Sequence, residues 1–275
     1  MSQKKNESGK LVLLLIASVS IVVLIYCVVR LTLYTLSTGK SRNEIKDLKS
    51  KTESEQAVTP YLISDSGSIK TNDDEGVKEL SVLSKYKPLY KDNSDFSGWV
   101  TIDGTKIDYP IMQTIDDEEF YLHKNFNKEK SDEGLPFIDA RCDITLPSSN
   151  LIVYGHNMKN GDIFADLLKF SDKDYLDKHP FVKFDTIYET GIYKIISVFR
   201  VDVSGEDPNE FKFYEFVNDS ESYPLSRYLS EIKSHSLFEI PFEEENVLSL
   251  ITLVTCEYTK KDGRMVMIAA KMSDI

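Results

Sequence analysis

The sequence VLSLITLVTCEYTKKDGRMVMIAAKM, residues 247–272, decides the fold expected for this chain. Its first ten residues are nearly all β-branched or aliphatic and end at Cys256. A polar segment with the turn residues Asp262 and Gly263 follows, and a second apolar run begins at Arg264. Two apolar runs around a glycine-containing connection predict a β-hairpin. Because both faces of the first run are apolar, we expect a central strand that is buried on both sides.

The register of this hairpin decides whether Cys256 and Arg264 meet. A hairpin centred on Lys260 places Cys256 directly opposite Arg264 on one face of the sheet. A tight turn at Asp262 and Gly263 would instead shift the register and separate the two side chains. We favour the first register because it brings a thiol and a guanidinium within reach of one substrate.

The N-terminal part is predicted to be a membrane anchor. Nineteen residues between Lys10 and Arg30 carry no charge, and a helix of that length crosses roughly 30 Å of hydrocarbon. Basic residues flank the span on both sides, so their count alone leaves the orientation open. No small-x-small cleavage site follows, so we predict a cytoplasmic N-terminus over residues 1–10 and an uncleaved anchor over residues 11–36. A cleaved secretory signal is the alternative, and both place the C-terminal part outside the cytoplasm.

The remainder divides into a polar stalk and one globular domain. Residues 37–75 are rich in Ser, Thr, Lys, Glu and Asp, so they cannot bury enough apolar surface to fold alone. Within this stalk, residues 41–56 have the spacing of a solvated helix. Residues 76–275 suit a single domain. The net charge of −12 argues against nucleic acid binding.

The pattern within residues 76–275 is that of a mainly β domain with helical decorations, an α+β fold. Besides the final hairpin, we predict strands over residues 98–102, 107–112, 135–138, 151–154, 182–188 and 192–203. We predict helices over residues 75–90, 163–170, 172–177 and 224–234, the first of them ending near Pro88. Short strands of this number favour a β-barrel or a sandwich.

Cys256, His156 and Arg264 are the candidate catalytic residues. A thiol needs a base or a cation nearby to act as a nucleophile, and a disulfide between Cys142 and Cys256 would abolish that chemistry. His156 follows an apolar run that ends on a glycine, whereas His123 has the surroundings of a packed side chain. Arg264 would be a permanent hydrogen-bond donor for an oxyanion. Together the three residues predict an acyl-transfer site.

The residues around Cys256 match a known family. Residues 252–256 read TLVTC, the TLxTC form of the sortases, with Arg264 eight positions after the cysteine and His156 one hundred before it. The chain resembles the class B sortases over roughly residues 76–275. The resemblance includes NSDFSGWVTI at 93–102, KIDYPIMQ at 106–113, YLHKNF at 121–126, YGHNM at 154–158 and the helix at 224–234.

This resemblance implies a closed eight-stranded β-barrel with an N-terminal helix and an inserted helix before the last hairpin. It also implies a cysteine transpeptidase on the surface of a Gram-positive bacterium, without a metal or cofactor. Cys256 would attack the Thr carbonyl of a C-terminal sorting signal on a secreted protein. His156 would protonate the leaving amine, and Arg264 would hold the oxyanion or position the substrate backbone. An amine of a peptidoglycan precursor, or a pilin lysine, would then release the product.

The resemblance also places Asn125, Tyr154 and Thr255 along the substrate groove. The alternative for each is structural: packing for Tyr154 and Thr255, and a loop cap for Asn125. Glu257 is expected to face solvent or pair with a cation, because a carboxylate pointing inward would raise the pKa of the thiol. The aromatic residues of segment 211–216 are expected to pack against the inserted helix.

Two other functions remain open. A different cysteine acyl-transfer enzyme, an L,D-transpeptidase or a wall-directed peptidase, would also depend on Cys256 but would act on peptidoglycan stem peptides. In a non-enzymatic surface domain, Cys256 and Arg264 would have only structural roles.

Overall fold

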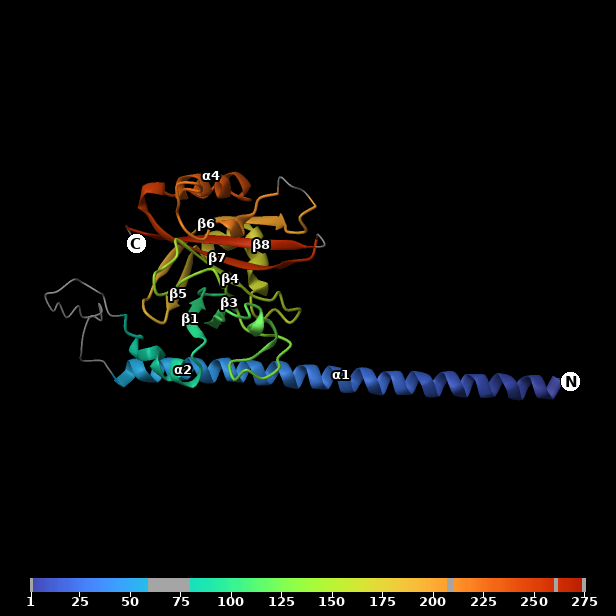
Figure 1. Cartoon of the computed structure of the whole chain (residues 1–275). Coiled ribbons are helices and arrows are strands. Elements are labelled where there is room, and N and C mark those ends of the chain that lie inside the picture. The colour runs from blue at the N-terminus through green and yellow to red at the C-terminus, as the bar shows by residue number, and fades with distance from the viewer. Residues whose placement is uncertain (1, 59–79, 207–209, 260–261, 274–275) are drawn as a thin grey trace. The chain divides into compact units, whose positions relative to one another are not determined.

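The computed structural model describes residues 2–58, 80–206, 210–259 and 262–273 (Figure 1). The chain forms two compact units, Met1–Glu44 and Ile45–Ile275. Helix α1 (Ser2–Val58) supplies the first unit and the start of the second. Its stretch Leu13–Ser54 contains a window that is long and apolar enough to cross a membrane. By length and composition, the helix is therefore a candidate membrane anchor.

The last turns of α1 belong to the second unit and do not behave as a free stalk. The helix predicted over residues 41–56 lies within α1, but it is not fully solvated because Leu48 is buried in the hydrophobic cluster around Trp99. Lys49 pairs with Asp108 of the barrel. The prediction of a solvated helix is therefore wrong around Leu48. The assignment of residues 37–75 as a stalk stays a prediction, and residues 59–75 lie outside the described residues.

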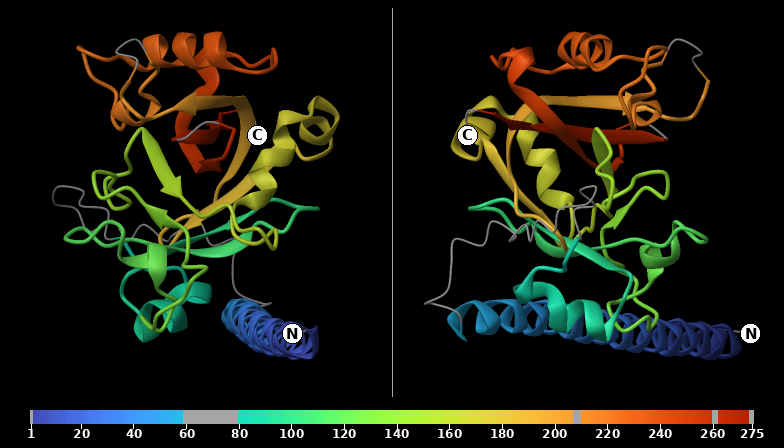
Figure 2. Two further views of the ribbon diagram at one scale, coloured as in Figure 1. Left: turned by 90° about the vertical axis from the view of Figure 1, so that its right-hand side faces the viewer. Right: turned by 60° about the vertical axis from the view of Figure 1, so that its left-hand side comes forward.

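Eight strands close into a barrel in the order β1-β2-β3-β4-β7-β8-β6-β5, with β5 pairing back onto β1 (Figures 1 and 2). The β2·β3 and β4·β7 pairs are parallel and the other pairs are antiparallel. The strands are β1 (Phe96–Thr101), β2 (Asp108–Met112), β3 (Phe137–Ile138), β4 (Asn150–Tyr154), β5 (Phe181–Thr186), β6 (Ile192–Asp202), β7 (Val247–Glu257) and β8 (Gly263–Met272). The prediction of a closed eight-stranded barrel is confirmed.

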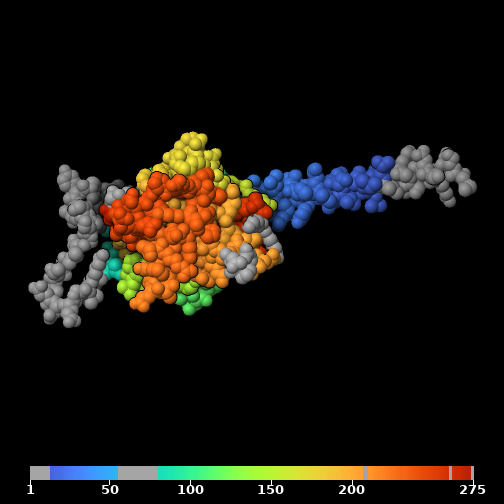
Figure 3. Space-filling model, turned by 90° about the horizontal axis from the view of Figure 1, so that it is seen from above, coloured from blue at the N-terminus to red at the C-terminus, as the bar shows by residue number. Residues whose placement is uncertain are grey.

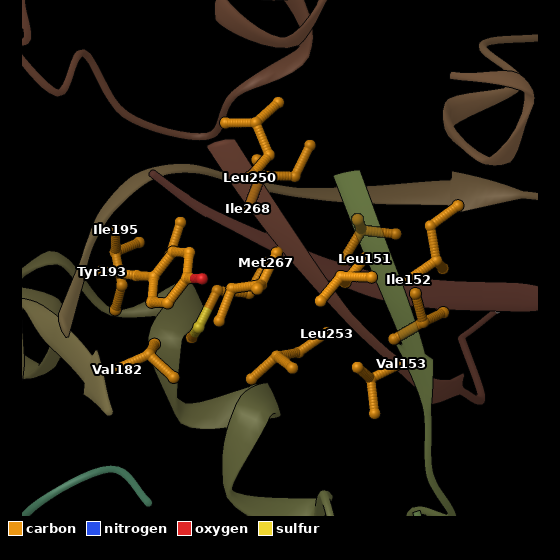
Figure 4. Close-up of a cluster of buried hydrophobic side chains, with 14 of the residues drawn as sticks. Leu151, Ile152, Val153, Val182, Tyr193, Ile195, Leu250, Leu253, Met267 and Ile268 are labelled. Atoms are coloured by element: carbon orange, nitrogen blue, oxygen red, sulfur yellow. The ribbon is translucent and has the colours of Figure 1, made fainter. Parts of the chain in front are cut away.

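Strand β7 lies at the centre of the sheet, between β4 and β8. Its residues are buried without interruption from Leu250 to Thr255, as expected for a strand covered on both faces. Figure 4 shows side chains of β4, β7 and β8 in the core together with Val182 and Tyr193. The apolar character of the final hairpin thus reflects its position between other strands.

The inserted helix α4 (Leu225–His235) lies over β6, on the side of the barrel away from helix α2 (Lys87–Asp92) (Figures 1 and 2). Tyr228, Leu229 and Ile232 form its buried face. The Tyr228 ring stacks on Phe216 with a centroid distance of 4.3 Å. The prediction that the aromatic residues before this helix pack against it is therefore confirmed. Figure 3 shows this segment and α4 covering one face of the molecule.

The shorter helices differ from the prediction. The helix predicted over residues 75–90 is, in its described part, a 3₁₀ turn η1 (Ser84–Tyr86) followed by α2. Pro88 lies in the first turn of α2, where its missing N–H has no intrahelical partner to lose, so it begins a helix there and does not end one. The predicted helix over 163–170 is a 3₁₀ helix, η3 (Ala165–Ser171).

The remaining helical elements are short. They are η2 (Phe120–His123), α3 (Lys173–Lys178), η4 (Phe213–Glu215) and η5 (Glu244–Asn246). The helix predicted over residues 172–177 corresponds to α3, whose start is capped because the carboxylate of Asp172 accepts hydrogen bonds from the N–H groups of Asp174 and Tyr175.

Candidate active site

The parallel pair β4·β7 and the antiparallel pair β7·β8 bring three candidate residues to one end of the barrel. Cys256 pairs directly with Arg264 across the final hairpin, so the favoured register is confirmed. Tyr154 pairs with Val254 in the parallel pair, and the next amide, that of Gly155, donates to the carbonyl of Val254 at 3.0 Å. His156 follows directly and therefore lies beside the end of β7.

Further hydrogen bonds join the two strand ends. The amide Nδ2 of Asn157 donates to the carbonyl of Cys256 at 3.0 Å. The hydroxyl of Thr255 donates to the carbonyl of Gly155 at 2.8 Å, and both residues are buried. Thr255 and Cys256 are thus bonded to the residues before and after His156, which fixes the backbone positions of the two candidate catalytic groups.

The ring of His156 has a defined hydrogen-bond partner. Its Nε2 lies 2.9 Å from the carbonyl oxygen of Leu122. A carbonyl can only accept, so Nε2 carries the hydrogen of this bond and Nδ1 is the nitrogen left to exchange a proton in the site. Burial lowers the pKa of His156 below its ordinary value, and the bond to Leu122 opposes this effect.

A strained loop follows His156. The amide of Phe164 donates to the carbonyl of His156 at 2.9 Å, and Asn157 forms an isolated bridge with Ile163. Ile163 has φ of 58°, in the left-handed region that a β-branched residue rarely adopts. The loop keeps this conformation because the phenol of Tyr109 accepts a hydrogen bond from the amide of Ile163 at 3.0 Å.

A second histidine lies at the site and was missed by the sequence reasoning. The ring centroid of His123, at the end of η2, is 5.8 Å from that of His156. His123 lies within the segment YLHKNF, next to the residue that binds His156. The sequence of this segment gives no indication that His123 lies near His156. We had expected a packed side chain, but His123 is exposed.

The thiol and the guanidinium are both half-buried. Cys256 is a free cysteine. The Nη1 group of Arg264 donates to the carbonyl of Gly263 at 3.0 Å. Cys142 is also a free thiol, buried with its sulfur 3.4 Å from the carbonyl oxygen of Asn150, so no disulfide joins it to Cys256. Burial raises the pKa of Cys142 to about 12, which keeps this thiol protonated and unreactive.

The three predicted substrate-binding residues have partners inside the protein. The hydroxyl of Thr255 is bonded to Gly155, as described above. The phenol of Tyr154 donates to Asp139 at 3.2 Å, and burial raises the pKa of Tyr154. Asn125 closes a tight loop, since its Oδ1 accepts from the amide of Glu129 at 2.8 Å. A role of these side chains in contacting substrate stays a prediction.

The expectation for Glu257 was wrong. This residue is buried, and its carboxylate accepts hydrogen bonds from the amide and the hydroxyl of Thr259. Side chains alternate along a strand, so Glu257 lies on the face opposite to Cys256 and is satisfied there without facing solvent. Among the described residues, no group of three His, Cys, Asp or Glu side chains is placed to hold a metal ion.

Comparison with known proteins relates the chain to one family. A family model of the sortase domain matches residues 100–272. Sortase B of Listeria monocytogenes is 37% identical over 191 residues, which cover 67% of this chain and 73% of that protein. Sortase B of Staphylococcus aureus is 26% identical over 190 residues, covering 68% and 75%. The crystal structure of sortase B from B. anthracis has a TM-score of 0.66 at 25% identity and covers 86% of this chain and 98% of its own.

Proposed function

This chain belongs to the sortase family of cysteine transpeptidases, and from that premise we propose that it is a membrane-anchored class B enzyme that cleaves a C-terminal sorting signal after Thr and transfers the protein to an amine. The observation that carries the proposal is the direct pairing of Cys256 with Arg264, next to the strand end that bears His156.

In the first half of the proposed reaction, the sulfur of Cys256 attacks the carbonyl carbon of the substrate Thr. The electron pair of the C=O bond moves to oxygen, and the guanidinium of Arg264 donates hydrogen bonds to the resulting oxyanion. His156 takes the proton of the Cys256 thiol as the C–S bond forms, and it gives this proton to the leaving amine as the C–N bond breaks. The products are a thioester on Cys256 and a released C-terminal fragment.

In the second half, the acceptor amine attacks the thioester carbonyl. His156, now neutral, takes a proton from this amine, and the thiolate of Cys256 leaves as the new amide bond forms. Nδ1 of His156 is the nitrogen suited to both proton transfers, because Nε2 of the same ring donates to the carbonyl of Leu122 at 2.9 Å. The bond to Leu122 also orients the ring for each transfer.

Arg264 suits the oxyanion role because its charge is permanent and its orientation is fixed. A guanidinium offers five N–H donors in a planar fork and keeps its proton at any physiological pH. The bond from Nη1 to the carbonyl of Gly263 holds one side of this fork. Lysine in its place would supply a charge without the same fixed geometry, so Arg264→Lys is expected to lose most activity.

The cellular arrangement is part of the proposal. Residues 11–36 of α1 would span the membrane, residues 1–10 would lie in the cytoplasm, and the catalytic domain, residues 76–275, would lie outside it. The donors would be secreted proteins that carry sorting signals. The acceptor would be a peptidoglycan precursor amine or a pilin lysine.

Peptide cleavage tests this function. The full chain in detergent is incubated with internally quenched peptides of the NPxTx, SPxTG and LPxTG types, each with and without an amine acceptor, and products are identified by mass spectrometry. Cleavage after Thr with an amine-ligated product is expected, and Cys256→Ala should abolish it. Reaction of stem peptides alone would favour an L,D-transpeptidase or peptidase, and no reaction at all would favour a non-enzymatic domain.

A further inference from the structure

We propose that His123 is a second histidine of the active site, a positioning residue whose ring lies beside that of His156 and favours the neutral form of His156. This inference rests on the proposed function of His156 as the proton carrier. It begins from geometry, because two consecutive residues of the chain contact one imidazole. The carbonyl of Leu122 accepts from Nε2 of His156, and the ring of His123 lies 5.8 Å away at an interplanar angle of 33°.

The segment that carries these two contacts is itself fixed. The facing segment 131–135 is bonded to the end of η2, since Ser131 donates to the carbonyl of His123 at 3.0 Å and Leu135 donates to that of Tyr121 at 2.9 Å. Between them, Gly134 has φ of 59°, and a Cβ added there would lie 2.3 Å from the carbonyl oxygen of Leu122. Glycine at this position therefore lets the Leu122 carbonyl keep the place in which it binds His156.

The His123 ring is exposed, whereas the ring of His156 beside it is half-buried. When His123 is protonated, a second positive charge on the half-buried ring of His156 is disfavoured by repulsion between the two rings. The direction of this effect agrees with the three influences on the pKa of His156. Burial lowers this pKa most, the hydrogen bond to Leu122 raises it, and the charge of His123 lowers it further.

The other charged side chains on the elements around His156 interact with other groups or are exposed to solvent. Lys124, next to His123, lies over the ring of Phe120 at 5.6 Å. On the facing segment, Glu133 accepts a hydrogen bond from Asn160 at 3.0 Å, and Asp132 is exposed. Lys159 on the loop after His156 is exposed, and Arg264 on β8 donates to the carbonyl of Gly263. Cys256, near the end of the neighbouring strand β7, is half-buried. Of the groups named here, His123 is the one whose ring lies beside that of His156, with the centroids 5.8 Å apart.

The consequence for catalysis concerns the acid side of the pH profile. His156 must be neutral to take the proton of the acceptor amine. By disfavouring imidazolium at His156, His123 extends the range of pH over which that step proceeds. Replacing His123 with glutamine removes the charge, so kcat/KM for the acceptor amine at pH 5.5, relative to its value at pH 8, should be about threefold lower than in the wild-type chain.

The direct test is an NMR titration of the histidine rings in the full chain in detergent. The protein contains four histidines, and His156→Gln identifies the signal of His156. The titration midpoint of His156 should rise in His123→Gln and return to the wild-type value or below it in His123→Lys, which restores a positive charge. His179→Gln is the matched control, because that ring packs on Tyr175, with centroids 4.5 Å apart.

An unchanged midpoint in His123→Gln, or an equal change in His179→Gln, would overturn the proposal. A rise in both His123→Gln and His123→Lys would also overturn it, because the effect would then come from lost packing and not from charge. The titration needs no substrate. If it gives the expected shifts while the wild-type chain cleaves no peptide, the coupling of the two histidines stands and the proposed function fails.

Discussion

The hydrogen bond from Thr255 to Gly155 gives the sharpest test of how the site is held together. It joins the residue before Cys256 to the residue before His156 at 2.8 Å, between two buried positions. Thr255→Val keeps the shape of the side chain but removes the donor. The variant therefore leaves the carbonyl of Gly155 without this bond and loosens the contact between the ends of β4 and β7.

The expected loss follows from burial. A buried acceptor that loses its partner costs about 1–3 kcal/mol, and each kcal/mol shifts Tm by roughly 2–4 °C in a domain of this size. We therefore expect Thr255→Val to lower Tm by roughly 2–12 °C. Small displacements of reacting groups reduce rates strongly, so kcat should fall about tenfold or more, with KM nearly unchanged.

Thermal unfolding and peptide-cleavage kinetics of the full chain in detergent measure both effects. Thr255→Ser is the control, because it keeps the hydroxyl and loses one methyl group, a cost of about 0.8 kcal/mol. The serine variant should lose a little stability and keep its kcat. If the valine and serine variants have the same kcat, the hydrogen bond does not position the site, and the reasoning from this contact is refuted.

Three further predictions concern buried or strained groups. Because burial depresses the pKa of His156 in the folded state, the unfolded chain binds the proton of this residue more tightly. The unfolding free energy should therefore fall as pH drops below about 6.5. An equally steep fall in His156→Gln would contradict this. At pH 7.5 iodoacetamide should label Cys256 and spare Cys142, whose pKa burial raises to about 12, and peptide mass spectrometry would reveal any labelling of Cys142 in the folded protein. Gly134→Ala should reduce the unfolding free energy by at least about 1–2 kcal/mol and should lower kcat by displacing the carbonyl that binds His156. Gly205 is also left-handed but has open space around an added Cβ, so Gly205→Ala should lose stability alone. Equal kcat values in the two variants would count against the displacement.

The sequence was most informative where both faces of an element are buried. The run that ends at Cys256 is apolar on both faces, and only a central strand buries both. The register then followed from the expectation that a thiol and Arg264 share one substrate, and the structure pairs them directly. The parallel pairing of β4 with β7 places residues one hundred positions apart side by side, as with Asn150 and Leu250.

The contacts around His156 could not be predicted in the same way. Leu122 precedes it by 34 residues and lies at the end of a short 3₁₀ helix, which has no periodicity that a sequence pattern can reveal. The helix ending predicted at Pro88 failed because proline is equally suited to the first turn of a helix. For Glu257, the sequence could not reveal that Thr259, two residues on, satisfies its carboxylate on the face opposite to the thiol.

The position of Cys256 at the meeting of a parallel and an antiparallel pair makes the site depend on register twice. Arg264 lies opposite Cys256 through the antiparallel pair, and His156 follows the strand that forms the parallel pair with β7. A slip of one residue in either pair would turn every side chain of the shifted strand to the other face of the sheet. Leu253 and Val254 lie on opposite faces of β7 and both are buried, so such a slip in β7 would disrupt the packing on both faces of the strand. The burial that stabilises the fold therefore also excludes the registers in which Arg264 and His156 would lie away from Cys256.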